Sequence, residues 1–332
     1  MQNEGASMRL LIAGGTSFVG RAIAHAAFNR GHDVTVINRG LTPNDLPVGV
    51  TRLVGDRRGD LSALRNLHFD ATIDTIAYRP SDVYALASAL EGRGGHHVQI
   101  SSVSAYAEPD SDGLTEDRGI LKSADGIDLE GPIDGRTYGP LKAACERAAL
   151  EVFDERRTFI RPTFVIGAYD ATLRFPYWVA RLRRGGDVAV PGPSTNALQY
   201  IDARDLADFT LECVEHTHLG AVHVAAPPTP ARYVEVIQAV ARHVAPPGTR
   251  VIEVDPVAVV DANLRERFPL WSGEKSETLL AVNPAKALAL GLHLRPLHES
   301  VDEVVAWWAA REWPKHWLGA DDERSLLATV SL

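Results

Sequence analysis

RLLIAGGTSFVG, residues 9–20, is the stretch that decides the fold. Its first five residues form an apolar run with the length of a buried strand, and a helical pattern follows as far as Phe28. Gly14 allows a sharp turn off the strand, and Gly20 allows the helix to lie close to the sheet. The free N–H groups of the first helical turn then predict a pyrophosphate site, the alternative being a strand-to-helix turn without a ligand.

Strand-like and helix-like segments alternate through the first half of the chain. Strands are predicted at 33–37, 50–54, 71–76 and 97–101, and a helix at 80–90. This alternation is typical of parallel strands joined by crossover helices. The predicted fold class is therefore α/β, a doubly wound parallel sheet of the Rossmann type with a smaller C-terminal α/β substrate-binding region.

Two unequal regions are expected within the 332 residues. Residues 8–168 are predicted to form mainly the dinucleotide-binding domain and residues 169–332 mainly the substrate-binding region. Residues 199–226 are expected to return to the Rossmann sheet.

The composition favours a cytoplasmic protein with a small-molecule substrate. The chain is 45% apolar and 23% charged, and its net charge of −9 is unfavourable for binding nucleic acid or an anionic membrane. Cys145 and Cys213 are too few for a disulfide framework, and no apolar run has membrane-spanning length. The twelve histidines, including His216 and His218 beside a loop, match no common metal-ligand spacing, so no metal site is predicted.

Ligands of such sheets lie beyond the carboxyl ends of the strands, where the sequence places Gly14, Asn38, Asp56, Ala77 and Ser102. The second strand ends in Asn38-Arg39-Gly40, without the acidic residue that would bind the ribose of NAD. Arg39 is suited to a 2′-phosphate, so NADP is preferred and NAD stays possible. The alternative is that Arg39 is a solvated surface residue.

Tyr138 and Lys142 lie four residues apart at the start of a predicted helix, so both side chains share one face. An ammonium group beside a phenol stabilises the phenolate and is expected to lower the pKa of Tyr138. Such a phenol exchanges a proton with a carbonyl or hydroxyl group. Ser101-Ser102 end the fifth strand, where a hydroxyl can polarise the same oxygen.

These residues resemble the extended and atypical short-chain dehydrogenases/reductases, the NAD-dependent epimerase/dehydratase family. The opening glycine motif is similar, with Ser17 where a glycine is usual. Asp56 matches the acid near adenine, Arg161–Gly167 the segment along the nicotinamide, Gln199–Ala207 a later strand-and-helix segment, and Asn283–Ala287 with Leu290-Gly291 a C-terminal signature.

The resemblance implies a role for each matching residue. Ser102, Tyr138 and Lys142 are the expected catalytic residues, with Tyr138 as general acid/base. The expected cofactor-binding residues are Gly14, Thr16, Ser17, Phe18, Val19, Gly20, Asn38, Arg39, Asp56, Ala77, Ser101, Tyr138, Lys142, Pro162 and Val165.

Departures from the family pattern narrow the range of expected activities. Val103-Ser104 follow Ser102 in place of the Asp-Glu pair of dehydratases, which disfavours dehydration. Residues 108–136 lengthen the connection to Tyr138, either as a loop near the active site or as a surface insertion.

Residues 173–184 combine aromatic residues with arginines, which suits a substrate pocket that binds a diphosphate; the alternative is an ordinary amphipathic helix. The candidate substrate-binding residues are Tyr78, Ser104, Tyr106, Arg174, Tyr177 and Arg181.

The predicted function is an NAD(P)-dependent oxidoreductase acting on a carbonyl or secondary alcohol of a sugar-like or natural-product substrate. An epimerase that retains NAD(H) and acts through a transient ketone needs the same three residues. An alternative of another class is a dinucleotide-binding regulatory or RNA-binding protein. A homodimer through residues 141–153 is possible.

Overall fold

The computed structural model describes residues 6–42, 45–107, 113–119, 121–192, 196–273, 280–309 and 311–330. Its centre is a seven-stranded parallel sheet with the strand order β10-β6-β5-β4-β1-β2-β3. The strands are β1 (Arg9–Ala13), β2 (Asp33–Asn38), β3 (Thr51–Val54), β4 (Ala71–Asp74), β5 (His96–Ile100), β6 (Arg157–Pro162) and β10 (Gly220–Val224). The order reverses between β1 and β4, which is where ligands of doubly wound sheets bind.

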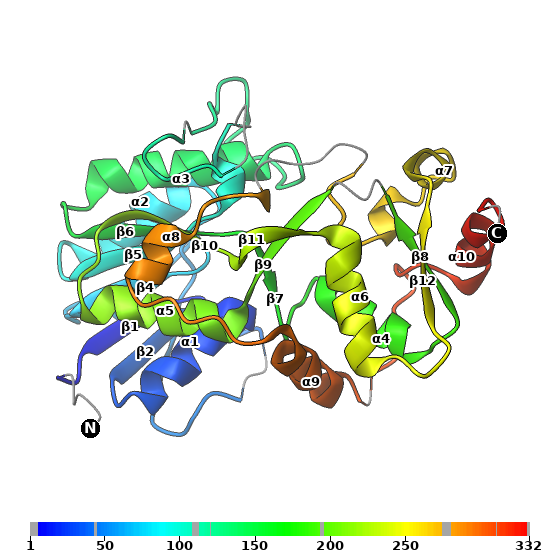
Figure 1. Cartoon of the computed structure of the whole chain (residues 1–332). Coiled ribbons are helices and arrows are strands. Elements are labelled where there is room, and N and C mark those ends of the chain that lie inside the picture. Colours follow the sequence, from blue (N-terminus) through cyan, green and yellow to red (C-terminus); the bar gives the residue numbers. More distant parts are fainter. Residues whose placement is uncertain are drawn as a thin grey trace.

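Helices cover both faces of this sheet (Figure 1). On one face α1 (Phe18–Asn29) packs against α5 (Ala203–Glu215), and on the other α2 (Pro80–Leu90) packs against α3 (Tyr138–Val152). All of these strands except the edge strand β3 are mostly buried, because helices cover both faces of the sheet. The predicted α/β doubly wound fold is confirmed.

A second region lies beside the carboxyl edge of the large sheet (Figure 1). It contains two small sheets, one of β7 (Phe164–Ile166), β9 (Ala197–Asp202) and β11 (Ala226–Arg232), the other of β8 (Asp187–Pro191) and β12 (Arg250–Val254). Its helices are α4 (Arg174–Arg183), α6 (Tyr233–Val244), α7 (Pro256–Asp261), α9 (Leu297–Trp308) and α10 (Ala320–Leu327), while α8 (Ala285–Ala289) packs beside β10. This region has a large core of its own, rich in tyrosine and tryptophan.

The described residues also form three short 3₁₀ turns, η1 (Ser62–Leu64), η2 (Val103–Ala105) and η3 (Arg265–Arg267). Within residues 199–226, β10 pairs with β6 in the large sheet, whereas β9 pairs with β7 and β11 in the three-stranded sheet. The domain boundaries at 168 and 169 stay a prediction. None of the helices in the described part of the chain has the length and hydropathy needed to cross a membrane.

Candidate active site

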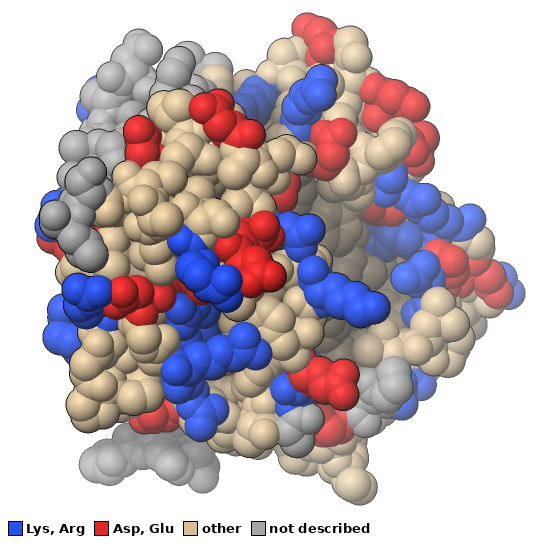
Figure 2. All heavy atoms as spheres, turned by 90° about the vertical axis from the view of Figure 1, so that its right-hand side faces the viewer, with Lys and Arg blue, Asp and Glu red and all other residues tan. Residues whose placement is uncertain are grey.

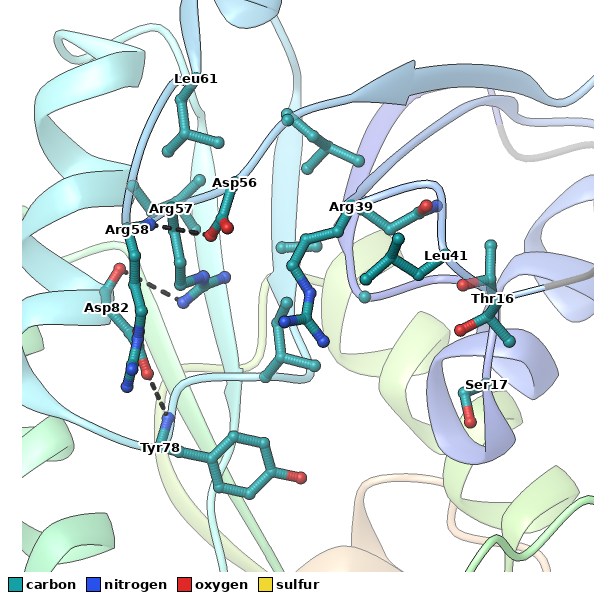
Figure 3. A pocket seen from close by; sticks show the side chains of 18 of the residues that line it. Thr16, Ser17, Arg39, Leu41, Asp56, Arg57, Arg58, Leu61, Tyr78 and Asp82 are labelled. Carbon is teal, nitrogen blue, oxygen red and sulfur yellow. Dashed lines mark hydrogen bonds between the residues drawn. The ribbon is translucent and has the colours of Figure 1, made fainter. Parts of the chain in front are cut away.

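A pocket of about 420 Å³ lies at the carboxyl ends of β1, β2, β3 and β4, close to the strand-order reversal (Figure 3). Seven predicted site residues line it: Gly14, Thr16, Ser17, Asn38, Arg39, Asp56 and Tyr78. They come from four separate strand ends and from the start of α1. The topology therefore brings these predicted residues together.

The turn between β1 and α1 is unusually tight. Gly14 has φ +91°, and a Cβ atom added to Gly20 would lie 2.2 Å from the carbonyl oxygen of Gly14. Any side chain at Gly20 would push the helix away from the strand, so this glycine permits the close approach. The hydroxyl of Ser17, the N-cap residue of α1, makes no capping hydrogen bond. The first turn of α1 thus presents backbone N–H groups at the pocket, which suits a pyrophosphate.

Two residues that line the same pocket carry buried polar atoms without partners. The side-chain amide nitrogen of Asn38 and the Nε of Arg79 are buried and have no hydrogen-bond partner among the described residues. Leu41 and Leu61 add apolar surface (Figure 3). This combination of apolar wall, unpaired polar atoms and helix N-terminus fits a dinucleotide.

The arginines of the pocket are not equivalent. Arg57 is bound bidentately to Asp74, with N–O distances of 2.9 and 3.0 Å, and it also donates to the carbonyl oxygen of Asp82. Burial opposes ionisation of Asp74, but the Arg57 charge and hydrogen bonds outweigh it and hold the pKa of that carboxyl below its usual range. Arg39 and Arg58 differ, because no described residue forms an ion pair or hydrogen bond with either guanidinium. Two guanidinium groups without a partner among the described residues therefore line the pocket.

The three predicted catalytic residues lie close to one another. Ser102 follows β5 and caps η2, where its Oγ accepts a hydrogen bond of 3.1 Å from the N–H of Ser104. The Ser102 hydroxyl also hydrogen-bonds to Tyr138, the first residue of α3. Lys142 lies one turn further along α3, with its Nζ 6.0 Å from the centre of the Tyr138 ring. The arrangement places a serine, a tyrosine and a lysine at the end of β5.

The expected lowering of the Tyr138 pKa by Lys142 is wrong for this structure. The Lys142 ammonium is buried and donates to the carbonyl oxygens of Ala77 at 3.0 Å and Ile100 at 2.8 Å. Burial raises the pKa of Tyr138, although the Ser102 hydrogen bond and the charge of Arg174 act in the opposite direction. The phenol is therefore held protonated, ready to donate a proton.

The other predicted cofactor residues are spread around this centre. Phe18 and Val19 begin α1, Pro162 ends β6, and Val165 lies in β7. The hydroxyl of Ser101 is buried and donates to Glu146 at 2.5 Å, so this side chain points into the interior, and the cofactor role of Ser101 stays a prediction.

Three of the predicted substrate residues lie near the site. Tyr78 lines the pocket and is 38% exposed, and its ring centre is 4.9 Å from the Lys142 Nζ. The N–H of Ser104 donates a hydrogen bond to the Oγ of Ser102. Arg174 is near enough to influence the pKa of Tyr138, and it forms no ion pair with a described residue. For these three residues substrate contact stays a prediction.

The other three substrate assignments are wrong, because these side chains are structural. Tyr106 is fully buried, and its hydroxyl bonds to Arg161 and His223. Tyr177 is buried in the core of the second region, against Trp178 and Trp317. Arg181 forms an ion pair with Glu323 at 2.7 Å and donates to two backbone carbonyls. Helix α4 is therefore mainly the amphipathic helix named as the alternative.

Sequence reasoning missed several pocket residues, among them Leu41, Arg58, Leu61, Arg79 and Asp82. Arg58 carried a usable signal, since it lies two residues after Asp56 in the same strand-end loop. The long segment after Ser102 is only partly described, because residues 108–112 and 120 lie outside the described ranges. Its described part reaches the site, as Arg79 donates to the carbonyl oxygen of Gly131 at 2.7 Å.

Comparisons with known proteins agree with this geometry. Residues 74–225 match the model of the NAD dependent epimerase/dehydratase family. A 2-alkyl-3-oxoalkanoate reductase of Stenotrophomonas maltophilia is 26% identical over 227 residues, which cover 61% of this chain and 64% of that protein. The chloroplast stem-loop binding protein of 41 kDa b of Arabidopsis thaliana is 25% identical over 215 residues, which cover 60% of this chain and 53% of that protein. The matches thus span less than two thirds of each curated relative.

Among solved structures, the enzyme WbmH of Bordetella bronchiseptica in complex with NAD⁺ superposes with a TM-score of 0.67 at 18% identity, covering 92% of this chain and 99% of that chain. The predicted resemblance is confirmed by these matches. Over residues 74–225 the chain therefore matches the NAD dependent epimerase/dehydratase family, and its fold is similar to that of the NAD⁺-bound WbmH structure.

Proposed function

We propose that this protein is an NADP(H)-dependent oxidoreductase that acts on a carbonyl or secondary alcohol of a natural-product-like small molecule. The observation that carries the proposal is the joint placement of Ser102, Tyr138 and Lys142 at the end of β5, beside a pocket that fits a dinucleotide.

NADP is the proposed cofactor because Arg39 and Arg58 line the pocket without partners in the described structure. A 2′-phosphate carries close to two negative charges, and guanidinium groups bind phosphate oxygens in pairs. NAD would leave both cations unpaired. The family model supports only NAD-dependent chemistry in general, so the preference for NADP is our inference.

When bound, the nicotinamide supplies or accepts a hydride. The remaining chemistry belongs to the side chains. In reduction, the protonated Tyr138 donates its phenolic proton to the substrate carbonyl oxygen, and the Ser102 hydroxyl donates a hydrogen bond to the same oxygen. Lys142 lies one turn further along α3, where its ammonium group donates to the carbonyl oxygens of Ala77 and Ile100. In the oxidative direction Tyr138 accepts the proton.

Net reduction is preferred over epimerisation because one relative is named as a reductase of an oxoalkanoate. Epimerisation through a transient ketone is the second candidate, and the family model that includes epimerases favours it. A reductase must exchange its cofactor at each turnover, whereas an epimerase keeps it.

The RNA-binding alternative is supported by the name of the second relative, the stem-loop binding protein. Two observations weigh against it. Ser102, Tyr138 and Lys142 are all present, and basic and acidic side chains are intermixed around the hollow on the face shown in Figure 2. A mixed surface is unsuited to an RNA backbone.

We also propose a cytoplasmic location and a homodimer. The two cysteines, Cys145 and Cys213, are free and buried, which suits a reducing compartment. Leu150 and Val152 are exposed apolar residues at the end of α3, within the segment proposed to dimerise. Light scattering of the purified chain tests the oligomeric state.

The deciding experiment measures which dinucleotide the purified protein holds and how tightly it binds NADPH and NADH. We expect protein without bound nucleotide that binds NADPH more tightly than NADH, followed by oxidation of NADPH with a subset of screened ketones. NAD(H) retained through purification would instead identify an epimerase. Failure to bind either dinucleotide would refute the proposed enzymatic function.

A further inference from the structure

Three potential metal ligands meet at the end of α5, far from the proposed active site. They are Glu212 in the last turn of the helix, His216 at its C-cap, and His218 two residues later. One ligand atom from each lies within 4.8 Å of the others. The pattern Glu-x-x-x-His-x-His matches no common metal-ligand spacing, but the fold brings the three side chains together.

The backbone holds both histidines in place. Thr217 has φ +51°, the left-handed conformation usually occupied by glycine at a helix end. The N–H of His218 donates to the carbonyl oxygen of Cys213 at 2.9 Å, and the N–H of Thr217 donates to Val214. This is the hydrogen-bond pattern of a Schellman motif, and it turns the chain so that the rings of His216 and His218 stack, with centres 5.8 Å apart.

The cluster has a fixed position relative to the sheet. The carbonyl oxygen of His218 accepts a hydrogen bond from Thr158, the second residue of β6, and β10 begins at Gly220. The three residues therefore lie at the amino ends of the parallel strands, whereas the nucleotide pocket lies at their carboxyl ends. The cluster takes no part in the proposed chemistry.

Electrostatics favour a cation here. Glu212 is half-buried and forms an ion pair with His216 at 2.9 Å, but it has no arginine or lysine partner among the described residues. The last carbonyl groups of α5 add partial negative charge at the helix end. A bound cation would interact favourably with both the Glu212 carboxylate and the helix end.

We propose that Glu212, His216 and His218 bind one divalent transition-metal ion, preferably Zn²⁺, which fastens the end of α5 to the start of β10. Two imidazole nitrogens and one carboxylate oxygen are a common zinc donor set, with water in the fourth position. Tetrahedral coordination at ordinary bond lengths needs ligand atoms about 3.3 Å apart. The side chains of His216, 54% exposed, and Glu212, 29% exposed, have room to rotate toward this spacing.

Thiol groups do not compete for the ion. Cys213 is adjacent to Glu212 in sequence, but its side chain is fully buried. Cys145 is buried in the same way within α3. Stoichiometric zinc binding would therefore report on the histidine cluster.

The test is calorimetric titration of the full chain with ZnCl₂, after removal of any histidine tag and treatment with a chelator. We expect one ion per chain with a Kd below about 10 µM. Single His216→Ala and His218→Ala variants should each weaken binding at least about tenfold, and the double variant should abolish it. His293→Ala is the matched control, since His293 is exposed and lies outside the cluster, and it should bind like the unmodified chain.

Circular dichroism of each variant shows whether it is folded, which separates loss of the site from loss of the protein. A visible Co²⁺ absorption that the double variant lacks would further support the site. Binding that survives in the folded double variant, or no saturable binding at 100 µM Zn²⁺, would overturn the proposal.

Discussion

Glu146 holds Arg161 through two hydrogen bonds, of 2.9 and 2.5 Å, and both side chains are almost fully buried. Glu146 lies one turn beyond Lys142 on α3, and Arg161 lies in β6. The same carboxylate accepts a hydrogen bond from the hydroxyl of Ser101 at the end of β5. One ion pair thus joins the helix that carries Tyr138 to the two strands beside it.

Replacement of Glu146 by alanine should lower the free energy of unfolding by about 3–5 kcal/mol, because the buried Arg161 charge loses its partner. Urea denaturation followed by circular dichroism measures the change. Glu151→Ala on the same helix is the control. Glu151 is exposed, and among the described residues its side chain bonds to Tyr84 alone, so a loss below about 1 kcal/mol is expected. Equal losses in the two variants would contradict a special role of the pair.

Replacement of Tyr138 by phenylalanine should reduce turnover by about 10²–10⁴-fold, because the proton donor is removed while the ring remains. Cofactor affinity should stay within about twofold. Steady-state kinetics and a fluorescence titration with NADPH measure the two effects. Tyr84→Phe, on α2 and exposed, should leave both unchanged. Full activity of the Tyr138 variant would remove this tyrosine from the mechanism.

The sequence was sufficient for the fold and for the edge of the sheet that carries the site. The strand predictions 33–37 and 71–76 and the helix prediction 80–90 match β2, β4 and α2 closely, because buried strands and amphipathic helices have strong periodic signals. Parallel strands end at one edge, so residues from several strand ends had to meet there.

The sequence was insufficient to predict which side chains are buried by residues distant in the chain. The periodicity of residues 173–184 indicated one apolar face but not what covers it. Tyr177 packs in a core formed with the distant Trp317, and Arg181 pairs with Glu323, 142 residues away. Tyr106 was misassigned for the same reason, since its partners Arg161 and His223 come from other strands.

Replacement of both Arg39 and Arg58 by alanine should weaken NADPH binding by at least about tenfold, because two charge-assisted contacts to the 2′-phosphate are lost. NADH, which lacks this phosphate, should bind with unchanged affinity. Parallel fluorescence titrations measure the ratio of the two dissociation constants. Arg65→Ala, an exposed arginine outside the pocket, is the control. Equal weakening for both dinucleotides would contradict the phosphate role.

Acid should destabilise the fold partly through His97. This imidazole stacks on Phe153 with ring centres 3.7 Å apart, and burial lowers its pKa to about 4. In the unfolded chain the pKa is about 6.5, so between these values the unfolded chain binds a proton that the folded chain does not. The stability contributed by neutral His97 is complete above pH 6.5 and is lost as the pH falls toward 4, by up to about 3 kcal/mol.

His97→Phe should preserve the ring contact and lessen the loss of stability between pH 7 and pH 4.5. Urea denaturation at a series of pH values measures the slope. His96, whose pKa burial also lowers to about 4, keeps part of the dependence in the variant. His293→Phe, at an exposed position, should keep the full slope. An unchanged slope in the His97 variant would show that its proton does not distinguish the two states.

Arg174 and Arg181 lie seven residues apart on α4 but should respond oppositely to replacement by alanine. Arg174 has no acidic partner among the described residues and influences Tyr138, so its loss should raise KM for the identified ketone by about tenfold with little effect on stability.

Arg181 binds the buried Glu323, so Arg181→Ala should lower the free energy of unfolding by about 3 kcal/mol and leave KM unchanged. Each variant thus serves as the control of the other, with thermal unfolding and steady-state kinetics measured on both. A raised KM in the Arg181 variant with unchanged stability would restore the substrate role that its ion pair now argues against. An unaltered KM in the Arg174 variant would show that α4 contributes no basic group to the substrate.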